Sequence, residues 1–233
     1  MPGIGQIGED DQSGLSWRDG IVPVSNRFDD PYFSLSDGLA ETRHVFLSGN
    51  DLPARFRDGF RIAELGFGTG LNMLATLIEW TRAGVPGRLL YTSFEAFPLS
   101  AAEIARALDA FPETRAVADP FLAAWETGAR EFDLGPLRVR VIVGDARASL
   151  PGWEDKADAW FLDGFSPAKN PELWSEELMA DVGRHTEAGG TFATYTAAGH
   201  VRRALQAAGF QVERAAGHGR KRHMTRGTLG PRP

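Results

Sequence analysis

The chain has 233 residues, a length that suits one α/β domain with elaborations. It contains no cysteine, which excludes disulfides, thiolate metal sites and a cysteine nucleophile. No run of about 18 apolar residues could cross a bilayer, and the N-terminus lacks the basic and apolar regions of a secretion signal. The net charge of −6 argues against broad, non-specific binding of nucleic acid. We expect a cytoplasmic protein with no membrane partner.

The charge is distributed unevenly along the chain. Residues 201–233 hold eight basic residues and one acid, which gives 8 − 1 = +7 and leaves −6 − 7 = −13 for residues 1–200. The basic residues are Arg202, Arg203, Arg214, Arg220, Lys221, Arg222, Arg226 and Arg232, and the acid is Glu213. This asymmetry indicates a localised anion-binding surface, with a solvated basic tail as the alternative.

The N-terminal part has a different character from the rest. Residues 1–20 are expected to be a flexible start. Residues 21–58 are expected to form a small cap of hairpin and loop, because several turn signals follow one another there. Residues 59–229 are predicted to form the main domain, and residues 230–233 a C-terminal tail.

From residue 60 onward, predicted strands alternate with predicted helices. The strands are residues 60–65, 89–95, 139–144, 157–162, 190–195 and 210–214, and the helices are residues 71–80, 100–110, 176–185 and 199–208. This alternation is typical of an α/β fold with a doubly wound, mostly parallel sheet. In such sheets, ligands bind beyond the carboxyl ends of the strands.

The first of these strands, which contains Glu64, runs into a turn formed by Gly66, Gly68 and Gly70. The glycines permit a tight turn against which a ligand can lie, and the following helix start offers N–H groups to an anionic group. A dinucleotide site would need glycine at position 71, where this chain has leucine. The pattern favours S-adenosylmethionine, whose ammonium Glu64 could bind. Glycines of an ordinary strand–helix turn are the alternative.

Acidic residues end the next two strands. Glu95, followed by Ala96, could accept hydrogen bonds from both ribose hydroxyls, and Asp145, followed by Ala146, from an adenine amino group. Either acid alone is more often a solvated loop residue. A glycine-rich turn, a glutamate and an aspartate at three successive strand ends together indicate an S-adenosylmethionine site, with S-adenosylhomocysteine as the product.

The fourth strand leads into a loop that contains Asp163 and Phe165. The Phe165 ring could stack on a flat base, a contact worth about 1–3 kcal/mol. An aspartate with a pKa of about 3.9 is a poor base for an aliphatic ammonium with a pKa near about 10. We therefore expect Asp163 to orient an amine and to stabilise the proton-bearing product. A structural turn with a core phenylalanine is the alternative.

Several segments resemble the MnmD-type methyltransferases, which form the methyltransferase domain of the bifunctional MnmC proteins. The likeness covers roughly residues 20–229 and is most specific in the stretch Trp-Phe-Leu-Asp-Gly-Phe at 160–165. The matching segments are residues 28–34, 38–47, 64–72, 93–99, 158–171, 189–195 and 217–224.

The resemblance implies a Rossmann-like class I methyltransferase with a small N-terminal cap. Its reaction is the transfer of a methyl group from S-adenosylmethionine to 5-aminomethyl-(2-thio)uridine at the tRNA wobble position, which gives the 5-methylaminomethyl form. The implied partner is the tRNA anticodon loop. MnmC proteins continue into an FAD-dependent oxidase domain, but no second dinucleotide fingerprint occurs here, so FAD is not expected in this chain. The oxidase would act in trans or belong to a longer protein.

No metal is expected, because the histidines show no ligand spacing with carboxylates. The motifs and the resemblance together give three sets of candidate site residues. The catalytic pair is Asp163 and Phe165. The cofactor set is Glu64, Gly66, Gly68, Gly70, Asn72, Glu95, Ala96, Asp145, Ala146 and Asp163. The set for substrate and tRNA is Tyr32, Phe33, Lys169, Arg220, Lys221 and Arg222.

Two other functions stay open at this point. One is an enzyme for a small amine, such as an N-methyltransferase of metabolites or a polyamine aminopropyltransferase. The other is a non-catalytic RNA-binding module on the same fold.

Overall fold

The computed structural model describes residues 14–34, 37–219 and 221–231. The strands are β1 (Leu15–Arg18), β2 (Val22–Ser25), β3 (Asp30–Pro31), β4 (Phe60–Leu65), β5 (Leu89–Glu95), β6 (Glu131–Leu134), β7 (Leu137–Val143), β8 (Ala157–Leu162), β9 (Thr186–Thr194), β10 (Phe210–Ala216) and β11 (His223–Leu229). The α-helices are α1 (Gly38–Thr42), α2 (Leu71–Ala83), α3 (Ala101–Leu108), α4 (Arg115–Glu126), α5 (Ala146–Ser149), α6 (Glu176–Arg184) and α7 (Gly199–Ala207).

Eight strands form one large sheet in the order β10-β11-β9-β8-β4-β5-β7-β6. The five central strands, β9 to β7, are parallel, whereas β6, β11 and β10 pair antiparallel with their neighbours. The chain moves outward from β4 to β5 on one side and later returns to β8 on the other. The strand order therefore reverses between β4 and β8, where a doubly wound sheet binds its ligand. This confirms the predicted α/β fold class.

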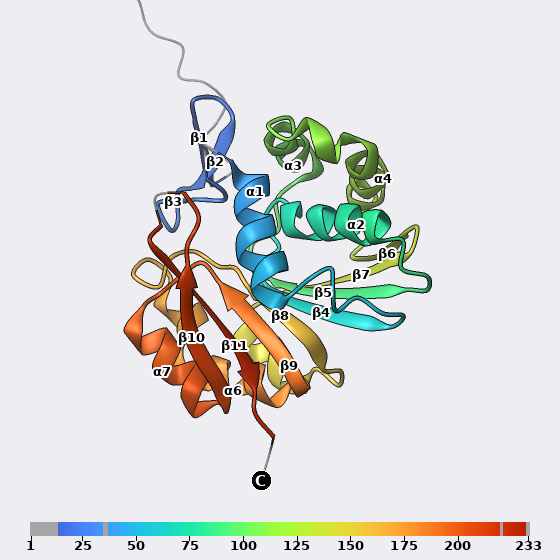
Figure 1. The fold of residues 1–233 in the computed structure, drawn as a ribbon. Helices are drawn as coiled ribbons and strands as arrows, with labels where there is room; N and C mark the ends of the chain where they lie inside the picture. The colour runs from blue at the N-terminus through green and yellow to red at the C-terminus, as the bar shows by residue number, and fades with distance from the viewer. Residues whose placement is uncertain (1–13, 35–36, 220, 232–233) are drawn as a thin grey trace, which may run out of the picture.

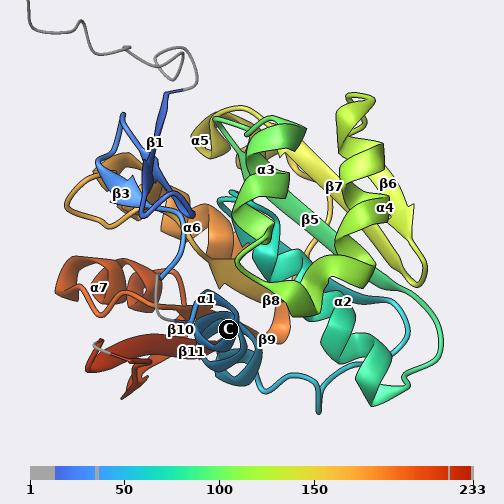
Figure 2. The same ribbon diagram turned by 90° about the horizontal axis from the view of Figure 1, so that it is seen from above.

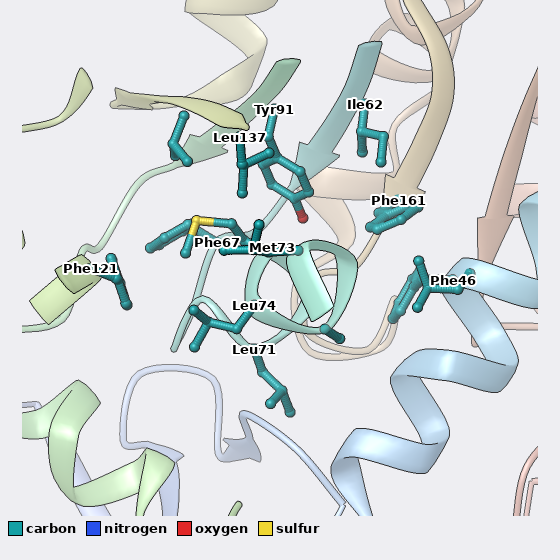
Figure 3. Close-up of a cluster of buried hydrophobic side chains, with 14 of the residues drawn as sticks. Phe46, Ile62, Phe67, Leu71, Met73, Leu74, Tyr91, Phe121, Leu137 and Phe161 are labelled. Atoms are coloured by element: carbon teal, nitrogen blue, oxygen red, sulfur yellow. The ribbon is translucent and has the colours of Figure 1, made fainter. Parts of the chain in front are cut away.

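Helices cover both faces of the large sheet. Helices α2, α3 and α4 lie on one face, and α6 and α7 lie on the other (Figures 1 and 2). Each face has its own buried apolar cluster. In Figure 3, Tyr91 from β5 and Phe161 from β8 extend from the sheet toward helix α2, which carries Met73. Long apolar side chains on both faces hold the central strands rigidly, and this fixes the positions of their carboxyl ends.

Most predicted elements of the main domain coincide with observed ones, but two helices and two strands were missed: α4, α5, β6 and β11. The expected helix at residues 71–80 continues to Ala83 and ends at Gly84, which has left-handed backbone geometry. Strand β11 escaped prediction because residues 223–229 show little apolar alternation and look like part of a basic tail. It is stabilised by pairing with both β10 and β9, a tertiary effect that local propensity does not report.

The N-terminal region differs from its prediction in two respects. Leu15–Arg18, expected within a flexible start, form β1, which pairs with β2, because Leu15 is buried in the first apolar cluster. Residues 1–13 lie outside the described part of the chain. The expected cap of hairpin and loop also contains a helical stretch, α1, which continues through a π-helical turn, Arg43–Leu47. The Asp37 side chain accepts a hydrogen bond from Ala40 N at 3.0 Å and caps this stretch.

Candidate active site

Backbone hydrogen bonds join the carboxyl ends of the four strands that carry the candidate residues. Gly66 N donates to Phe94 O at 2.9 Å, and Asp163 N donates to Leu65 O at 3.0 Å. The next strand is connected in the same way, because Gly144 N donates to Glu95 O at 2.9 Å. The sequence motifs of β4, β5, β7 and β8 therefore lie side by side at one edge of the sheet.

Gly66 directly follows the carboxyl end of β4, beside the end of β8, and only glycine fits there. Its φ is +89°, in the left-handed region that favours glycine, and a methyl group at this position would overlap the carbonyl oxygen of Asp163. The glycine-rich turn is thus packed directly against the backbone of the candidate catalytic loop. A side chain at residue 66 would push the two halves of the site apart.

The Glu95 carboxylate organises the glycine-rich turn. Its Oε2 accepts a hydrogen bond from Gly68 N at 2.9 Å, and its Oε1 accepts one from Phe97 N at 2.7 Å. Burial raises the pKa of Glu95, and the backbone donors act in the opposite direction. Each carboxylate oxygen has a further lone pair that can accept from a diol. The position fits the predicted ribose contact, with Ala96 exposed beside it.

Glu64 is fully buried beneath the turn. One of its carboxylate oxygens accepts from Asn72 Nδ2 at 2.9 Å, and the other accepts from Ser93 Oγ at 2.7 Å. Burial raises the pKa of Glu64 to about 8. Because no surface of Glu64 is exposed, direct contact with the cofactor's ammonium would require the residues that cover it to move. The predicted contact stays a prediction, and the observed function of Glu64 is to hold Asn72 and Ser93.

Asn72, in the first turn of α2, connects the carboxyl groups of Glu64 and Asp163. Its Nδ2 donates both to Glu64 and to Asp163 Oδ2, the latter at 2.7 Å. Its Oδ1 accepts a hydrogen bond from Thr42 Oγ1 at 2.9 Å. Because a hydroxyl occupies the oxygen side, the amide is fixed with its donor side toward both carboxyl groups. Thr42 was absent from the predicted set.

Asp163 differs from its prediction in acidity. Burial raises its pKa to about 7, while the Asn72 hydrogen bond and the charge of Lys221 act in the opposite direction. The expectation that Asp163 has the ordinary aspartate pKa of about 3.9 is therefore wrong. The sequence revealed the residue but not how its surroundings shield the carboxyl group from water. At neutral pH, Asp163 is populated in both protonation states and can accept a proton.

Phe165 lies in an aromatic cluster shared between the catalytic loop and the cap. Its ring stacks on Phe28 at a centroid distance of 4.8 Å, and the Tyr32 ring meets it edge-on at 5.1 Å. Trp174 Nε1 donates to the Phe165 carbonyl oxygen at 2.8 Å, and this hydrogen bond holds the backbone of the loop at Phe165. Tyr32 therefore lies beside Phe165, and its predicted contact with substrate stays a prediction. Phe28, which the prediction omitted, lies there too.

Ion pairs attach the cap to the catalytic loop. Lys169 Nζ lies 3.1 Å from Asp29 Oδ2 and 3.8 Å from Asp30 Oδ1, and Ser166 N donates to Asp30 Oδ2 at 2.8 Å. Lys169, predicted to contact substrate, therefore holds the cap in this arrangement.

Two predicted residues lie away from the centre of the site. Phe33 packs edge-on against Phe111 at a centroid distance of 4.9 Å, and its predicted contact with substrate stays a prediction. The Asp145 carboxylate, half-exposed, is bound by the guanidinium of Arg147, whose Nη2 lies 2.6 Å from Oδ2, and this lowers the pKa of Asp145. An adenine contact at Asp145 would share the carboxylate with Arg147. Ala146 is buried and begins α5.

The predicted basic segment lies beside the site. Lys221 Nζ pairs with Glu41 Oε1 at 2.8 Å and lies 4.0 Å from the centroid of the Tyr195 ring. Arg222 is exposed, and Arg220 lies outside the described residues. Glu41 and Tyr195 were missed by the prediction, although both fall within the segments that resemble MnmD-type enzymes. Over the described ranges, no group of three or more histidine or acidic side chains could hold a metal ion, and no helix is long and apolar enough to cross a membrane.

Known proteins are similar to this chain in sequence. The chain is 45% identical over 223 residues to the tRNA 5-methylaminomethyl-2-thiouridine biosynthesis bifunctional protein MnmC of Leptospira borgpetersenii, a match that covers 91% of this chain and 34% of that protein. The MnmC of Caulobacter sp. strain K31 is 48% identical over 223 residues, with 90% and 37% covered. The chain thus spans about a third of the length of these relatives.

A solved structure and a family model agree with the relatives. MNMC2 from Aquifex aeolicus superposes with a TM-score of 0.76 at 29% identity, covering 96% of this chain and 73% of that one. A family model described as S-adenosyl-L-methionine-dependent methyltransferase matches residues 112–230, just over half of the chain. The resemblance noted in the sequence is confirmed, and the chain belongs to this family of S-adenosyl-L-methionine-dependent methyltransferases.

Proposed function

We propose that the chain methylates the primary amine of 5-aminomethyl-(2-thio)uridine at the wobble position of tRNA and gives the 5-methylaminomethyl form. The observation that carries the proposal is the partly buried Asp163 carboxyl, which Asn72 orients and which lies in the same loop as Phe165. An acid and an aromatic ring suit an amine on a flat pyrimidine. The names of the MnmC relatives point to the same modification, which favours it over a small-amine enzyme or a non-catalytic module.

The residues at the strand ends fit S-adenosylmethionine. Because Gly68 has no side chain, its backbone stays accessible; a Cβ atom there would lie close to the Tyr32 ring. Glu95 presents oxygens suited to a ribose diol. In the proposal, Gly66, Gly68 and Gly70 hold the amino acid part of the cofactor. When bound, S-adenosylmethionine supplies an activated methyl group, so the protein contributes chiefly by positioning.

The amine must lose a proton before its lone pair can attack. In the proposal, the Asp163 carboxylate accepts that proton, and its raised pKa of about 7 reduces the mismatch with an aliphatic ammonium. The N–C bond would then form as the S–C bond breaks, and the electron pair of the S–C bond would stay on sulfur. Asn72 keeps Oδ2 of Asp163 occupied, which leaves Oδ1 to face the amine.

The aromatic cluster provides a place for the base. Phe28 stacks on one face of Phe165 and Tyr32 meets the ring edge-on, so aromatic rings from the cap and from the catalytic loop lie together. Stacking of a base on such a ring contributes about 1–3 kcal/mol. Arginines of the segment at 217–224 would contact phosphates of the anticodon stem. The free amine would come from an FAD-dependent oxidase, either in trans or within a longer protein.

The test is methyl transfer from labelled S-adenosylmethionine to tRNA that carries the aminomethyl group. We expect transfer to this tRNA, none to tRNA with the fully methylated wobble base, and none to free polyamines. Absence of transfer to the aminomethyl tRNA, with cofactor binding confirmed by calorimetry, would refute the proposal.

A further inference from the structure

The ammonium of Lys221 occupies a cation-binding position close to the proposed reaction centre. A carboxylate oxygen of Glu41 lies 2.8 Å from Nζ, and the centroid of the Tyr195 ring lies 4.0 Å from it. A carboxylate together with the face of an aromatic ring is a combination that recognises organic cations. Lys221 enters this position from the turn between β10 and β11.

Both components of this position are connected to Asp163. Tyr195 Oη donates to the carbonyl oxygen of Gly164, the residue that follows Asp163, at 2.7 Å. Glu41 immediately precedes Thr42, whose hydroxyl fixes the Asn72 amide that binds Asp163. The charges of Lys221 and Glu41 shift the pKa of Asp163 in opposite directions, so both act on the same site.

The exposure of the two charged groups is unequal. The Glu41 side chain is 12% exposed, whereas that of Lys221 is 45% exposed. The carboxylate is therefore the fixed, largely buried partner, and the lysine, on a flexible stem, is the exchangeable one. Exchange of one ammonium for another keeps the carboxylate paired, which avoids the cost of a buried, uncompensated charge.

We propose that Glu41 and the face of Tyr195 form a subsite for a primary ammonium beside Asp163, and that Lys221 fills it until the aminomethyl group of the substrate replaces it. This inference rests on the proposed amine substrate. A neutral hydroxymethyl group in the same place would leave Glu41 without its cation. The subsite therefore selects an amine over a hydroxyl of nearly the same size, and the displaced Lys221 moves to the surface beside Arg222.

The experiment compares two nucleosides and several variants in protein saturated with S-adenosylhomocysteine. The probes are 5-aminomethyluridine and its neutral counterpart 5-hydroxymethyluridine, titrated calorimetrically. Lys221→Met removes the resident cation and should tighten binding of the amine roughly threefold to tenfold, because an ion pair and a cation–π contact no longer compete. Binding of the hydroxymethyl nucleoside should not tighten. Glu41→Gln should weaken amine binding by a similar factor.

Matched variants control for charge and fold. Lys156→Met removes an exposed lysine just before β8, at the opposite end of that strand from Asp163, and should leave both affinities unchanged. Lys221→Arg retains a resident cation and should not tighten amine binding. The proposal is overturned if Lys221→Met binds the amine no more tightly than the unmodified protein, or if Glu41→Gln leaves amine binding unchanged. It is also overturned if both the unmodified protein and Lys221→Met fail to bind the amine at millimolar concentration.

Failure of the proposed function would look different. If the nucleoside affinities follow the expected pattern but aminomethyl tRNA is not methylated, the ammonium subsite stands and the tRNA reaction is refuted. If the tRNA is methylated while amine binding is indifferent to Lys221 and Glu41, the function stands and the subsite is refuted.

Discussion

Asn72 Nδ2 donates a hydrogen bond to Asp163 Oδ2 at 2.7 Å, and this contact connects the start of α2 to the end of β8. The same nitrogen donates to the buried Glu64 carboxyl. One amide thus orients both acids on the two sides of the point where the strand order reverses. The relationship matters because a hydrogen bond to a carboxylate favours its charged form.

Loss of the Asn72 amide should therefore change the pH dependence of methyl transfer. In the Asn72→Ala variant the pKa of Asp163 rises further above about 7, because a donor to the charged form is gone. Less Asp163 is then deprotonated at neutral pH, and the acid limb of kcat/KM moves to higher pH. Thr76→Val is the matched control, since the Thr76 hydroxyl donates to the backbone oxygen of Asn72 and not to its amide. An acid limb that does not move in Asn72→Ala would separate Asp163 from the proton transfer.

Substitution of Asp163 itself should separate catalysis from cofactor binding. Asp163→Asn keeps the size of the side chain but cannot accept the proton, and general-base assistance contributes roughly 10²–10⁴-fold. We expect kcat to fall by that factor while the Kd for S-adenosylmethionine, measured by calorimetry, stays within about threefold. A large loss of cofactor affinity would instead assign Asp163 to the cofactor site.

Gly66 offers a test of the contact between the two halves of the site. In Gly66→Ala the new methyl group meets both a positive φ and the Asp163 carbonyl oxygen. Gly128 is the matched control, because its φ of +85° is similar and nothing lies within 4 Å of an added methyl group. Denaturant unfolding should show a loss of about 1–2 kcal/mol for Gly128→Ala and of more than about 3 kcal/mol for Gly66→Ala. Equal losses would mean that backbone strain alone explains the glycine.

The basic segment should contribute to tRNA affinity in a salt-dependent way. Replacement of Arg220 and Arg222 by glutamine should weaken binding and reduce the slope of log K against log salt by roughly 0.7–0.9 for each phosphate that is no longer neutralised. The control is the double variant Arg138→Gln with Arg140→Gln. Both residues lie on β7, next to the edge strand β6 and across the sheet from β10 and β11, and the slope should be unchanged. A slope unaffected by the replacement of Arg220 and Arg222 would remove this segment from the interface.

The positions of the site motifs could be predicted from sequence because their signals are local. An apolar run that ends in glycine or an acid marks the carboxyl end of a strand, and the alternation of strands and helices brings those ends together. Residues 64–70, Glu95 and Asp163 were found in this way, and the structure places them at one edge of the sheet. The helix predicted at residues 100–110 is observed as α3, and the side chains of Ser100 and Glu103 form a capping box at its start.

Properties that depend on tertiary packing could not be predicted. The raised pKa of Asp163 follows mainly from desolvation of its carboxyl group, which no local sequence pattern reports. The Lys221–Glu41 pair joins residues 180 positions apart in the chain. The apolar face of the helical stretch after Asp37 was hidden among turn signals, because residues such as Gly38 and Gly49 favour turns in isolation.

The central claim is tested most directly by mass spectrometry of the wobble nucleoside. tRNA from a methylation-deficient strain, incubated with this protein and S-adenosylmethionine, would be digested to nucleosides and compared with tRNA incubated with Asp163→Asn. The account predicts conversion of 5-aminomethyl-(2-thio)uridine to its 5-methylaminomethyl form by the unmodified protein and little or none by the variant. An unchanged wobble nucleoside, in the presence of folded protein with bound cofactor, would contradict it.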